Sequence, residues 1–181
     1  MKIAIVTSGD YVYAGNIFID AKSKGHNISF IDVLGSPKNL IFKKFKLIFL
    51  FGIFDSLSFL ISSYRNKKYI KKSSNVRIIH KHDIGSVLLR GDFDLIILIN
   101  YAFRFPLDEK INIVNCHPSL LPKFQGLMSI SHNVNDALLN NLNNVKTGIT
   151  VHQIDNNFDI GKLIIQKSIE LPSDTKLFYF Y

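Results

Sequence analysis

The first 33 residues alternate between short apolar runs and one segment of helical periodicity, and this alternation constrains the fold most. Lys2–Thr7 (KIAIVT) is a β-branched apolar run typical of a buried strand. Between Ala14 and Lys24 the apolar positions repeat with helical spacing, and Gly25 ends that segment. Asn27–Val33 (NISFIDV) has the pattern of a second strand. A strand, a helix and a strand in this order predict the opening unit of an α/β fold with a parallel sheet.

Later apolar segments continue this sheet. Val76–Ile79 and Asp94–Asn100 predict two more strands, and the second is apolar on both faces, as a central parallel strand must be. Asn112–Cys116 predicts a further strand, while Gly148–Ile154 and Lys162–Ile169 predict a closing pair. We therefore expect an α/β protein with an open, mostly parallel twisted sheet.

An unusual segment, Asn39–Lys72, interrupts this pattern after the second strand. Its apolar core, Leu47–Ile61, spans 15 residues and contains Gly52 and Asp55, whereas a bilayer-crossing helix needs about 20 apolar residues. We expect a helical hairpin that packs on the domain or in a homodimer interface. A peripheral membrane helix at residues 43–72 fits the same apolar body and lysine-rich ends. Both interpretations stay open at the level of sequence.

The positive charge of the chain is concentrated in the same segment. The formal net charge is +8. The basic residues of the segment, which only Asp55 opposes, are Lys43, Lys44, Lys46, Arg65, Lys67, Lys68, Lys71 and Lys72. The basicity is therefore local rather than a property of the whole surface, which disfavours nucleic acid as a partner.

The length and composition fit one globular domain in a reducing compartment. The chain has 181 residues, of which 47% are apolar and 20% charged. A single cysteine excludes an internal disulfide framework, and the start MKIAIVTSGD lacks the zones of a signal peptide. We expect one cytoplasmic domain, with contact to the inner face of the membrane as the open alternative.

The stretch Ile113–Pro122 (IVNCHPSLLP) contains the strongest candidate for chemistry. Successive side chains of a strand point to opposite faces, so Asn115 and His117 share a face and Cys116 points away from it. This geometry disfavours a Cys-His nucleophile pair and makes Cys116 a small buried apolar residue. A second histidine cluster, His80-Lys81-His82, is too small to complete a metal site, so we expect no metal.

Three motifs follow one another in a specific order. They are N-x-H-P-S-L-L-P-x-x-x-G at Asn115–Gly126, T-G-I-T-V-H at Thr147–His152, and D-x-G at Asp159–Gly161. This order closely resembles the folate-dependent formyltransferase family, which includes glycinamide ribonucleotide transformylase, methionyl-tRNA formyltransferase and the sugar N-formyltransferases. The resemblance is strongest over Leu95–Thr175. It implies a Rossmann-like formyltransferase fold over 1–181, with a helical insertion at about 39–72.

The resemblance also implies the catalytic residues and the formyl donor. By motif, the catalytic set is Asn115, His117 and Asp159, and the donor is 10-formyltetrahydrofolate. Transfer of a formyl group to an amine passes through a tetrahedral intermediate whose oxygen gains negative charge. An amide N–H of Asn115 and a protonated His117 suit that oxygen, since such a donor is worth roughly 3 kcal/mol elsewhere. Asp159 then supports the imidazole charge and relays the proton that the amine loses.

The same resemblance implies a binding pocket for the pterin ring of the donor. Phe103, Arg104 and Phe105 follow the central strand and form one side of this pocket, and the segment Ile154–Phe158 closes the other side. The cofactor-binding residues carried over are Phe103, Arg104, Phe105, Ile154, Asp155 and Phe158. A plain role of the aromatic residues at the edge of the core remains the alternative.

Departures from the family bear on the amine acceptor. Glycinamide enzymes carry a glycine-rich phosphate loop after the first strand, where this chain has Ser8-Gly9-Asp10-Tyr11. The tRNA enzymes continue into a second, basic domain, and this chain ends at Tyr181. A nucleotide-linked amino sugar is therefore the preferred small-molecule acceptor, with glycinamide ribonucleotide and methionyl-tRNA as alternatives.

Two further departures leave alternatives to an active transferase open. The residues after Gly126 differ from the proline and aromatic that are usual in the family, and the chain stops where the family adds at least one helix. These C-terminal elements are expected to be missing, which allows a shortened, non-catalytic binding or assembly module. A third reading is a formyltetrahydrofolate hydrolase, in which water replaces the amine.

Overall fold

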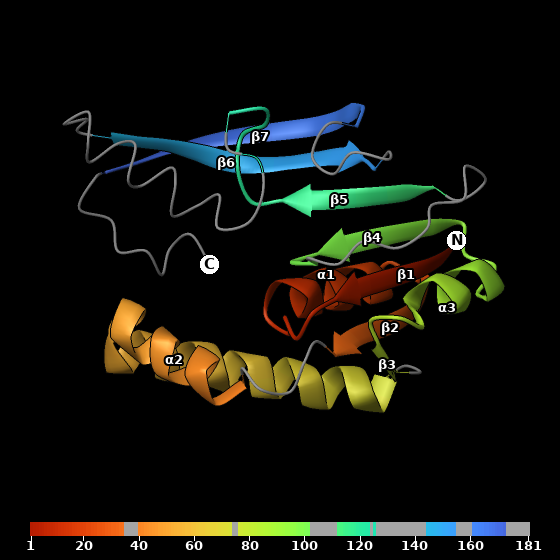
Figure 1. Cartoon of the computed structure of the whole chain (residues 1–181), viewed down its shortest axis with the longest axis horizontal. Coiled ribbons are helices and arrows are strands. Elements are labelled where there is room, and N and C mark those ends of the chain that lie inside the picture. Colours follow the sequence, from red (N-terminus) through yellow and green to blue (C-terminus); the bar gives the residue numbers. More distant parts are fainter. Residues whose placement is uncertain are drawn as a thin grey trace. The chain divides into compact units, whose positions relative to one another are not determined.

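The computed structural model describes residues 1–34, 40–73, 76–101, 112–123, 125, 144–154 and 161–172. The chain divides into two compact units, Met1–Asn112 and Ile113–Tyr181 (Figure 1). The first contains the parallel strands and all the helices that the structure describes. The second contains three further strands.

The N-terminal unit is built on a parallel sheet. Its strands are β1 (Lys2–Thr7), β2 (Asn27–Leu34), β3 (Val76–His80) and β4 (Leu95–Ile99). They pair in the order β3-β2-β1-β4, and Ile5 of β1 lies opposite Phe30 of β2 and Ile97 of β4. The central strands are apolar on both faces, and Ile5 and Phe30 are completely buried. Such burial is what parallel strands covered on both faces require.

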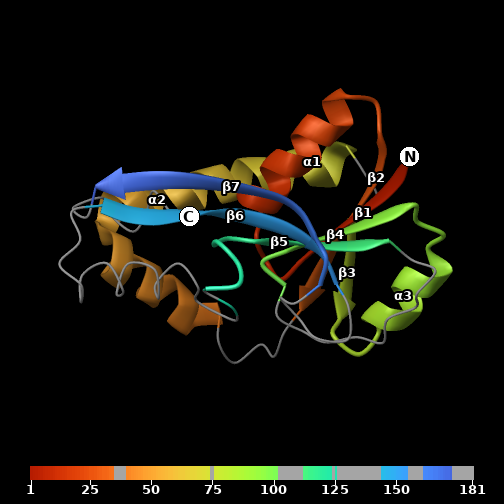
Figure 2. The same cartoon turned by 90° about the horizontal axis from the view of Figure 1, so that it is seen from above.

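Two short helices cover opposite faces of this sheet (Figure 2). They are α1 (Tyr13–Ser23) and α3 (Ile84–Arg90), and α3 was not predicted from the sequence. Phe18 of α1 packs edge-on against Phe30, with ring centroids 6.0 Å apart. Right-handed crossovers explain the two faces, because the chain steps one way from β1 to β2 and the other way from β3 to β4.

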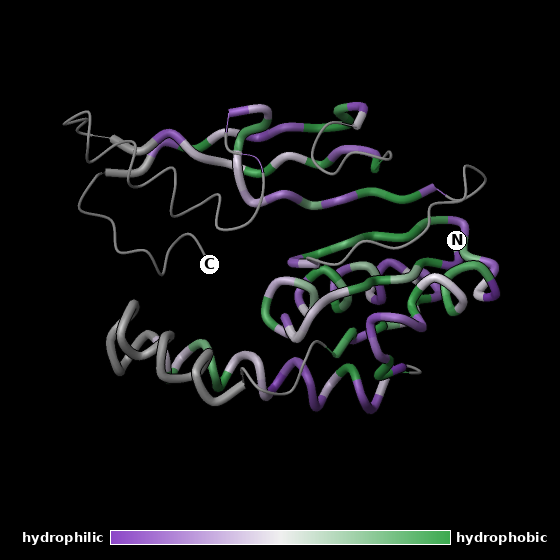
Figure 3. The backbone as a smooth tube through the Cα atoms, viewed as in Figure 1, coloured by the Kyte–Doolittle hydropathy of each residue, from purple (hydrophilic) through white to green (hydrophobic). Residues whose placement is uncertain are grey.

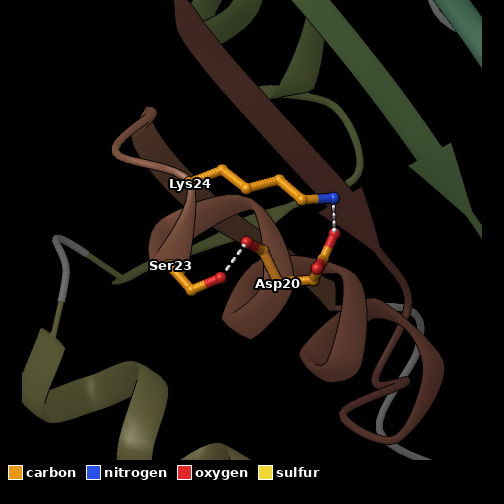
Figure 4. A network of polar contacts seen from close by, with 3 residues as sticks. All are labelled: Asp20, Ser23 and Lys24. Atoms are coloured by element: carbon orange, nitrogen blue, oxygen red, sulfur yellow. Dashed lines mark hydrogen bonds and ion pairs between the residues drawn. The ribbon is translucent and has the colours of Figure 1, made fainter.

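The carboxyl end of α1 is closed by local polar contacts (Figure 4). The Ser23 hydroxyl donates to the carbonyl oxygen of Asp20 at 2.7 Å, and Lys24 Nζ lies 2.8 Å from Asp20 Oδ2. Gly25 follows with φ of +80°, a backbone conformation that glycine adopts without steric cost. The predicted helix stop at Gly25 is confirmed.

The insertion after β2 is one helix, α2 (Leu40–Ser73), and the predicted hairpin is wrong. A glycine in a helix interior costs only about 1 kcal/mol of helix stability, and the helix continues through Gly52. Ser56 is 2% exposed and lies within the helix. No helix among the described residues is long and apolar enough to span a membrane.

The carboxyl half of α2 is fixed to α1. Asn66 Nδ2 donates to the Tyr11 carbonyl oxygen at 2.9 Å and lies 3.1 Å from Asn16 Oδ1. Ile70 is completely buried. Gly15 permits this close approach, because a Cβ there would lie 2.9 Å from the Asn66 Cβ. One face of α2 is therefore part of the N-terminal unit.

The C-terminal unit is antiparallel. Its strands are β5 (Ile113–His117), β6 (Asn144–Gln153) and β7 (Leu163–Pro172), and β6 pairs with both neighbours. The predicted closing pair is present, with β6 longer than expected because Asn144 and Val145 still pair with β7. The α/β class, its mostly parallel sheet and the helical insertion after the second strand are confirmed.

Candidate active site

The polar face of β5 carries two of the predicted catalytic residues. Burial alternates along the strand, and Asn115 and His117 are 8% and 5% exposed. Cys116, between them, belongs to the other, half-buried set of this strand. Burial raises the pKa of the Cys116 thiol to about 11. The thiol is therefore protonated at neutral pH and unsuited to act as a nucleophile.

Pairing between β5 and β6 places two residues of the T-G-I-T-V-H motif beside this face. Asn115 lies opposite His152, and His117 lies opposite Thr150. Directly opposite residues of an antiparallel pair project to the same side of the sheet. The four side chains are therefore neighbours, and all four are at least nine-tenths buried. Sequence distance hides this arrangement, since β5 and β6 are joined by a long connection.

A hydrogen bond orients the Asn115 amide. His152 Nδ1 lies 2.9 Å from the carbonyl oxygen of Gln153, which can only accept, so Nδ1 carries the hydrogen. In the neutral ring Nε2 is then an acceptor, and Asn115 Nδ2 lies 3.3 Å from it. The amide nitrogen of Asn115 therefore faces His152. This contact with His152 fixes the orientation of the Asn115 amide group on the polar face of β5.

Thr150 holds the loop that follows His117. Its hydroxyl donates to the Ser119 carbonyl oxygen at 2.6 Å and accepts from the Leu121 amide at 3.1 Å. Gln166 of β7 donates from Nε2 to Thr150 Oγ1 at 2.9 Å and to the Leu121 carbonyl oxygen at 3.0 Å. These bonds fix the backbone of the P-S-L-L-P loop to β6 and β7, immediately after the candidate catalytic histidine.

Gly148 has a steric reason to be glycine. A Cβ at this position would lie 2.0 Å from the Lys167 carbonyl oxygen and 2.8 Å from Leu120 Cδ2. Both distances are too short for any side chain. The glycine of the motif thus allows β7 and the loop after β5 to approach β6 closely, which brings Thr150 and His152 to their positions.

The sequence predictions for the remaining site residues fall largely outside the described part of the chain. Ile154 is described, and its amide donates to the Ile113 carbonyl oxygen at 3.1 Å. The others, which lie outside the described residues, are Phe103, Arg104, Phe105, Asp155, Phe158 and Asp159. Their roles remain predictions.

Sequence reasoning missed His152, Thr150 and Gln166 as supports of this site. The motif itself contained a signal, because His152 and Thr150 alternate along it as Asn115 and His117 do along β5. Gln166 had no such signal. Within the described residues no group of three or more potential ligands is arranged for a metal ion. His80 and His82 stack on one another with centroids 5.7 Å apart.

A second polar cluster lies in the N-terminal unit, where β1 ends. Asp32 Oδ1 accepts from the Gly9 amide at 2.9 Å, and Thr7 Oγ1 accepts from the Asp10 amide at 3.2 Å. Asp10 Oδ1 accepts from the amides of Val12 and Tyr13, each at 2.9 Å. Side-chain oxygens of the protein therefore occupy these four amide groups of the loop after β1.

The two carboxylates of this cluster are buried. Asp10 is 6% and Asp32 is 5% exposed. Burial raises the pKa of Asp10 above its usual 3.8, against the lowering effect of its hydrogen bonds to backbone amides and Asn100. The Tyr11 hydroxyl donates to Asp32 Oδ2 at 2.6 Å. Burial and this carboxylate together raise the pKa of Tyr11.

Comparison with known proteins fits the order of motifs and the strand arrangement. The family model described as formyl transferase matches residues 1–177. The chain belongs to this family. Formyl transferases that it resembles include the phosphoribosylglycinamide formyltransferase of Bacillus subtilis, with 30% identity over 125 residues. The GDP-perosamine N-formyltransferase of Brucella melitensis is 34% identical over 95 residues.

These matches cover limited parts of the relatives. The Bacillus alignment covers 67% of this chain and 56% of the relative, and the Brucella alignment covers 50% and 34%. The chain thus spans about half or less of the curated relatives it matches. A solved phosphoribosylglycinamide formyltransferase from Anaplasma phagocytophilum has a TM-score of 0.64 at 19% identity. That alignment covers 99% of this chain and 77% of the other, and it shows the formyl transferase fold.

Proposed function

We propose that this formyl transferase moves the formyl group of 10-formyltetrahydrofolate to a primary amine. The observation that carries the proposal is the buried polar face of β5 and β6, where Asn115 and His117 lie beside Thr150 and His152. In this family the N-x-H motif supplies the catalytic asparagine and histidine. The match over 1–177 supports applying the family reaction to this chain.

The chemistry assigned to these residues is stabilisation of an oxyanion. The donor supplies the formyl carbon; the amine forms a C–N bond to it, the bond to N10 of the folate breaks, and the amine proton passes to N10. Asn115, whose amide group is oriented by His152, donates an N–H to the formyl oxygen. His117 donates a ring N–H to the same oxygen. Asp159 takes part in the proton transfer.

The loop after β1 supports an acceptor without a phosphomonoester at that position. A phosphate cradle needs free backbone N–H groups. Here the amides of Gly9, Asp10, Val12 and Tyr13 are bonded to side-chain oxygens. A phosphate would have to displace Asp10 and would also face the carboxylate of Asp32. This arrangement argues against glycinamide ribonucleotide as the acceptor, although many structural neighbours carry that activity in their names.

The acceptor we propose is the amino group of a nucleotide-linked sugar. Such a molecule carries its phosphates as a diphosphate between two rings and needs no terminal phosphate site. The likeness to the Brucella GDP-perosamine N-formyltransferase supports this class. Whichever sugar it contains, the proposed acceptor is a small molecule with a primary amine.

The test measures the release of tetrahydrofolate from 10-formyltetrahydrofolate, which is monitored through the change in absorbance. Purified full-length chain is incubated with amino-sugar nucleotides, glycinamide ribonucleotide or charged initiator tRNA, and the product is identified by mass. We expect formylation of an amino-sugar nucleotide. Turnover with glycinamide ribonucleotide alone would refute the acceptor, and free formate without any acceptor would instead identify a hydrolase.

Matched histidine variants separate catalysis from folding. His117→Ala is expected to abolish turnover while the protein remains folded by circular dichroism. His80→Ala removes an exposed histidine of β3 and is expected to leave turnover unchanged. Folate binding without turnover for the whole acceptor panel would refute the proposed reaction and favour a binding module.

A further inference from the structure

The outward face of α2 carries a compact row of exposed apolar side chains. Leu57, Leu60, Ile61 and Tyr64 are 53%, 38%, 50% and 69% exposed. Their spacing of three, one and three residues puts them on one side of a helix with 3.6 residues per turn. Single exposed apolar residues are ordinary, but a row of four on one face is the pattern of a contact surface.

This row lies opposite the face that anchors α2. Asn66 and Ile70 hold the helix to α1, the first through hydrogen bonds and the second through complete burial. With 100° per residue, Leu57 and Tyr64 lie about 160–180° around the helix axis from Asn66. Asn66 and the apolar row are therefore on opposite sides of the helix, so the hydrogen bonds of Asn66 leave the row exposed.

The same outward face becomes basic towards the end of the helix. Lys68 and Lys71 follow Tyr64 on the same side of the helix, about one and two turns later, and both are exposed. Exposed Arg65 and Lys72 flank them. Figure 3 shows this carboxyl part of α2 largely in the hydrophilic colour. In sequence the amino end of α2 is basic too, with Lys43, Lys44 and Lys46.

We propose that α2 binds the surface of a membrane rich in anionic lipid. The helix lies in the plane of the surface, with Leu57, Leu60, Ile61 and Tyr64 inserted at the boundary of headgroups and acyl chains. Lys68, Lys71 and Lys72 pair with lipid phosphates. Apolar burial and cationic attraction act together, which is the combination that stable peripheral binding requires.

The charge distribution favours lipid over the other occupants of such a face. A second copy of α2 would bring basic ends together in either orientation, because both ends are rich in lysine and Asp55 is the sole acidic residue of the helix. A nucleic acid would satisfy the lysines but leave the apolar row in water. An anionic lipid surface satisfies both halves of the face.

The experiment is co-sedimentation of the full chain with vesicles of phosphatidylcholine alone or of phosphatidylcholine and phosphatidylglycerol in equal parts. We expect binding to the anionic vesicles only, weakened by added salt. Lys68→Gln, Lys71→Gln and Lys72→Gln combined are expected to weaken binding roughly 100-fold, at about five-fold per lysine. Ile61→Ser with Tyr64→Ser is expected to weaken it independently, through lost apolar insertion.

The control variants make the same kinds of substitution at positions outside α2. Leu89→Ser removes a side chain that is 50% exposed on α3, and Lys22→Gln with Lys81→Gln removes two exposed charges elsewhere. These variants are expected to bind vesicles as the parent does. Three outcomes overturn the proposal: no binding to anionic vesicles, equal loss in the controls, or a dimer in sedimentation equilibrium that Ile61→Ser dissociates while vesicle binding is absent.

Discussion

Removal of the His152 ring is expected to slow formyl transfer through Asn115. The ring accepts a hydrogen bond from the Asn115 amide at 3.3 Å and is itself fixed by the Gln153 carbonyl oxygen at 2.9 Å. In His152→Ala the Asn115 amide is unchanged, but it loses the hydrogen bond that orients it. A fully lost oxyanion donor costs about 2.7–4 kcal/mol, or roughly 100- to 1,000-fold in kcat. Loss of orientation is a fraction of this, so we expect a decrease of about 10- to 100-fold.

The effect is measured as kcat and KM for tetrahydrofolate release at saturating acceptor. Because His152 acts through Asn115 and not on the substrate, kcat is expected to fall while KM changes little. His152→Gln is expected to restore much of the rate, because its side-chain oxygen can accept from Asn115 where Nε2 did. The melting temperature is measured in parallel, since loss of buried hydrogen bonds costs about 1–3 kcal/mol of stability.

A double-mutant cycle provides the refutation. If His152 acts only by positioning Asn115, the variant with both Asn115→Ala and His152→Ala is no slower than Asn115→Ala alone. Rates that multiply independently would show that His152 contributes by another route. An unchanged kcat in folded His152→Ala would refute the positioning role altogether.

Three other perturbations test the fold around the two polar clusters. Gly148→Ala puts a Cβ 2.0 Å from the Lys167 carbonyl oxygen and should lower the free energy of unfolding by about 3 kcal/mol. Ile149→Ala, at an exposed position, should change it little. Equal melting temperatures of the two variants would contradict the close approach of β6 and β7. Burial raises the pKa of Asp10 in the folded state above 3.8, so the folded state binds the proton more tightly and stability is lost as pH rises through that pKa. Asp10→Asn removes this loss, so urea titrations should show its stability gaining on the parent from about pH 3 to 7. With a pKa of about 11, Cys116 should react with iodoacetamide at pH 8 far more slowly in the native chain than in urea, and Cys116→Ser should retain turnover.

Local patterns predicted most of the strands because burial and periodicity are coupled within each element. Lys2–Thr7 and Asn27–Val33 are apolar runs bounded by loop residues, and β1 and β2 occupy almost the same positions. The alternation of Asn115 and His117 was equally readable from the strand period. Predictions of this kind need only the residues of one segment.

The hairpin prediction for α2 failed because turn-forming residues are weak signals inside a long helix. Gly52, Asp55 and Ser56 lie inside one continuous helix, whose carboxyl half is held by contacts with a distant part of the chain. Asn66 bonds to residues of α1 and the loop before it, about 50 positions earlier in the chain. The periodicity of the sequence around residue 55 does not predict those contacts.

Cross-strand partners were also beyond sequence reasoning. The pairing of Asn115 with His152 depends on the register of β5 and β6, and Asp32 reaches the Gly9 amide only because β1 and β2 are adjacent. No role for the Asp10 or Asp32 side chain was predicted from the sequence. Only the three-dimensional arrangement assigns their oxygens to the amides of the loop after β1.

The contact between α2 and the loop after β1 has a thermodynamic consequence. Asn66 bonds to the Tyr11 carbonyl oxygen, and Lys67 Nζ lies 4.8 Å from the centre of the Tyr11 ring. The helix that we propose binds lipid is therefore in direct contact with the loop that contains Asp10. If lipid binding changes the affinity of that loop for a ligand, the ligand must change the affinity for lipid by the same factor. Vesicle binding measured with and without an acceptor would test whether the helix and the loop are coupled in this way.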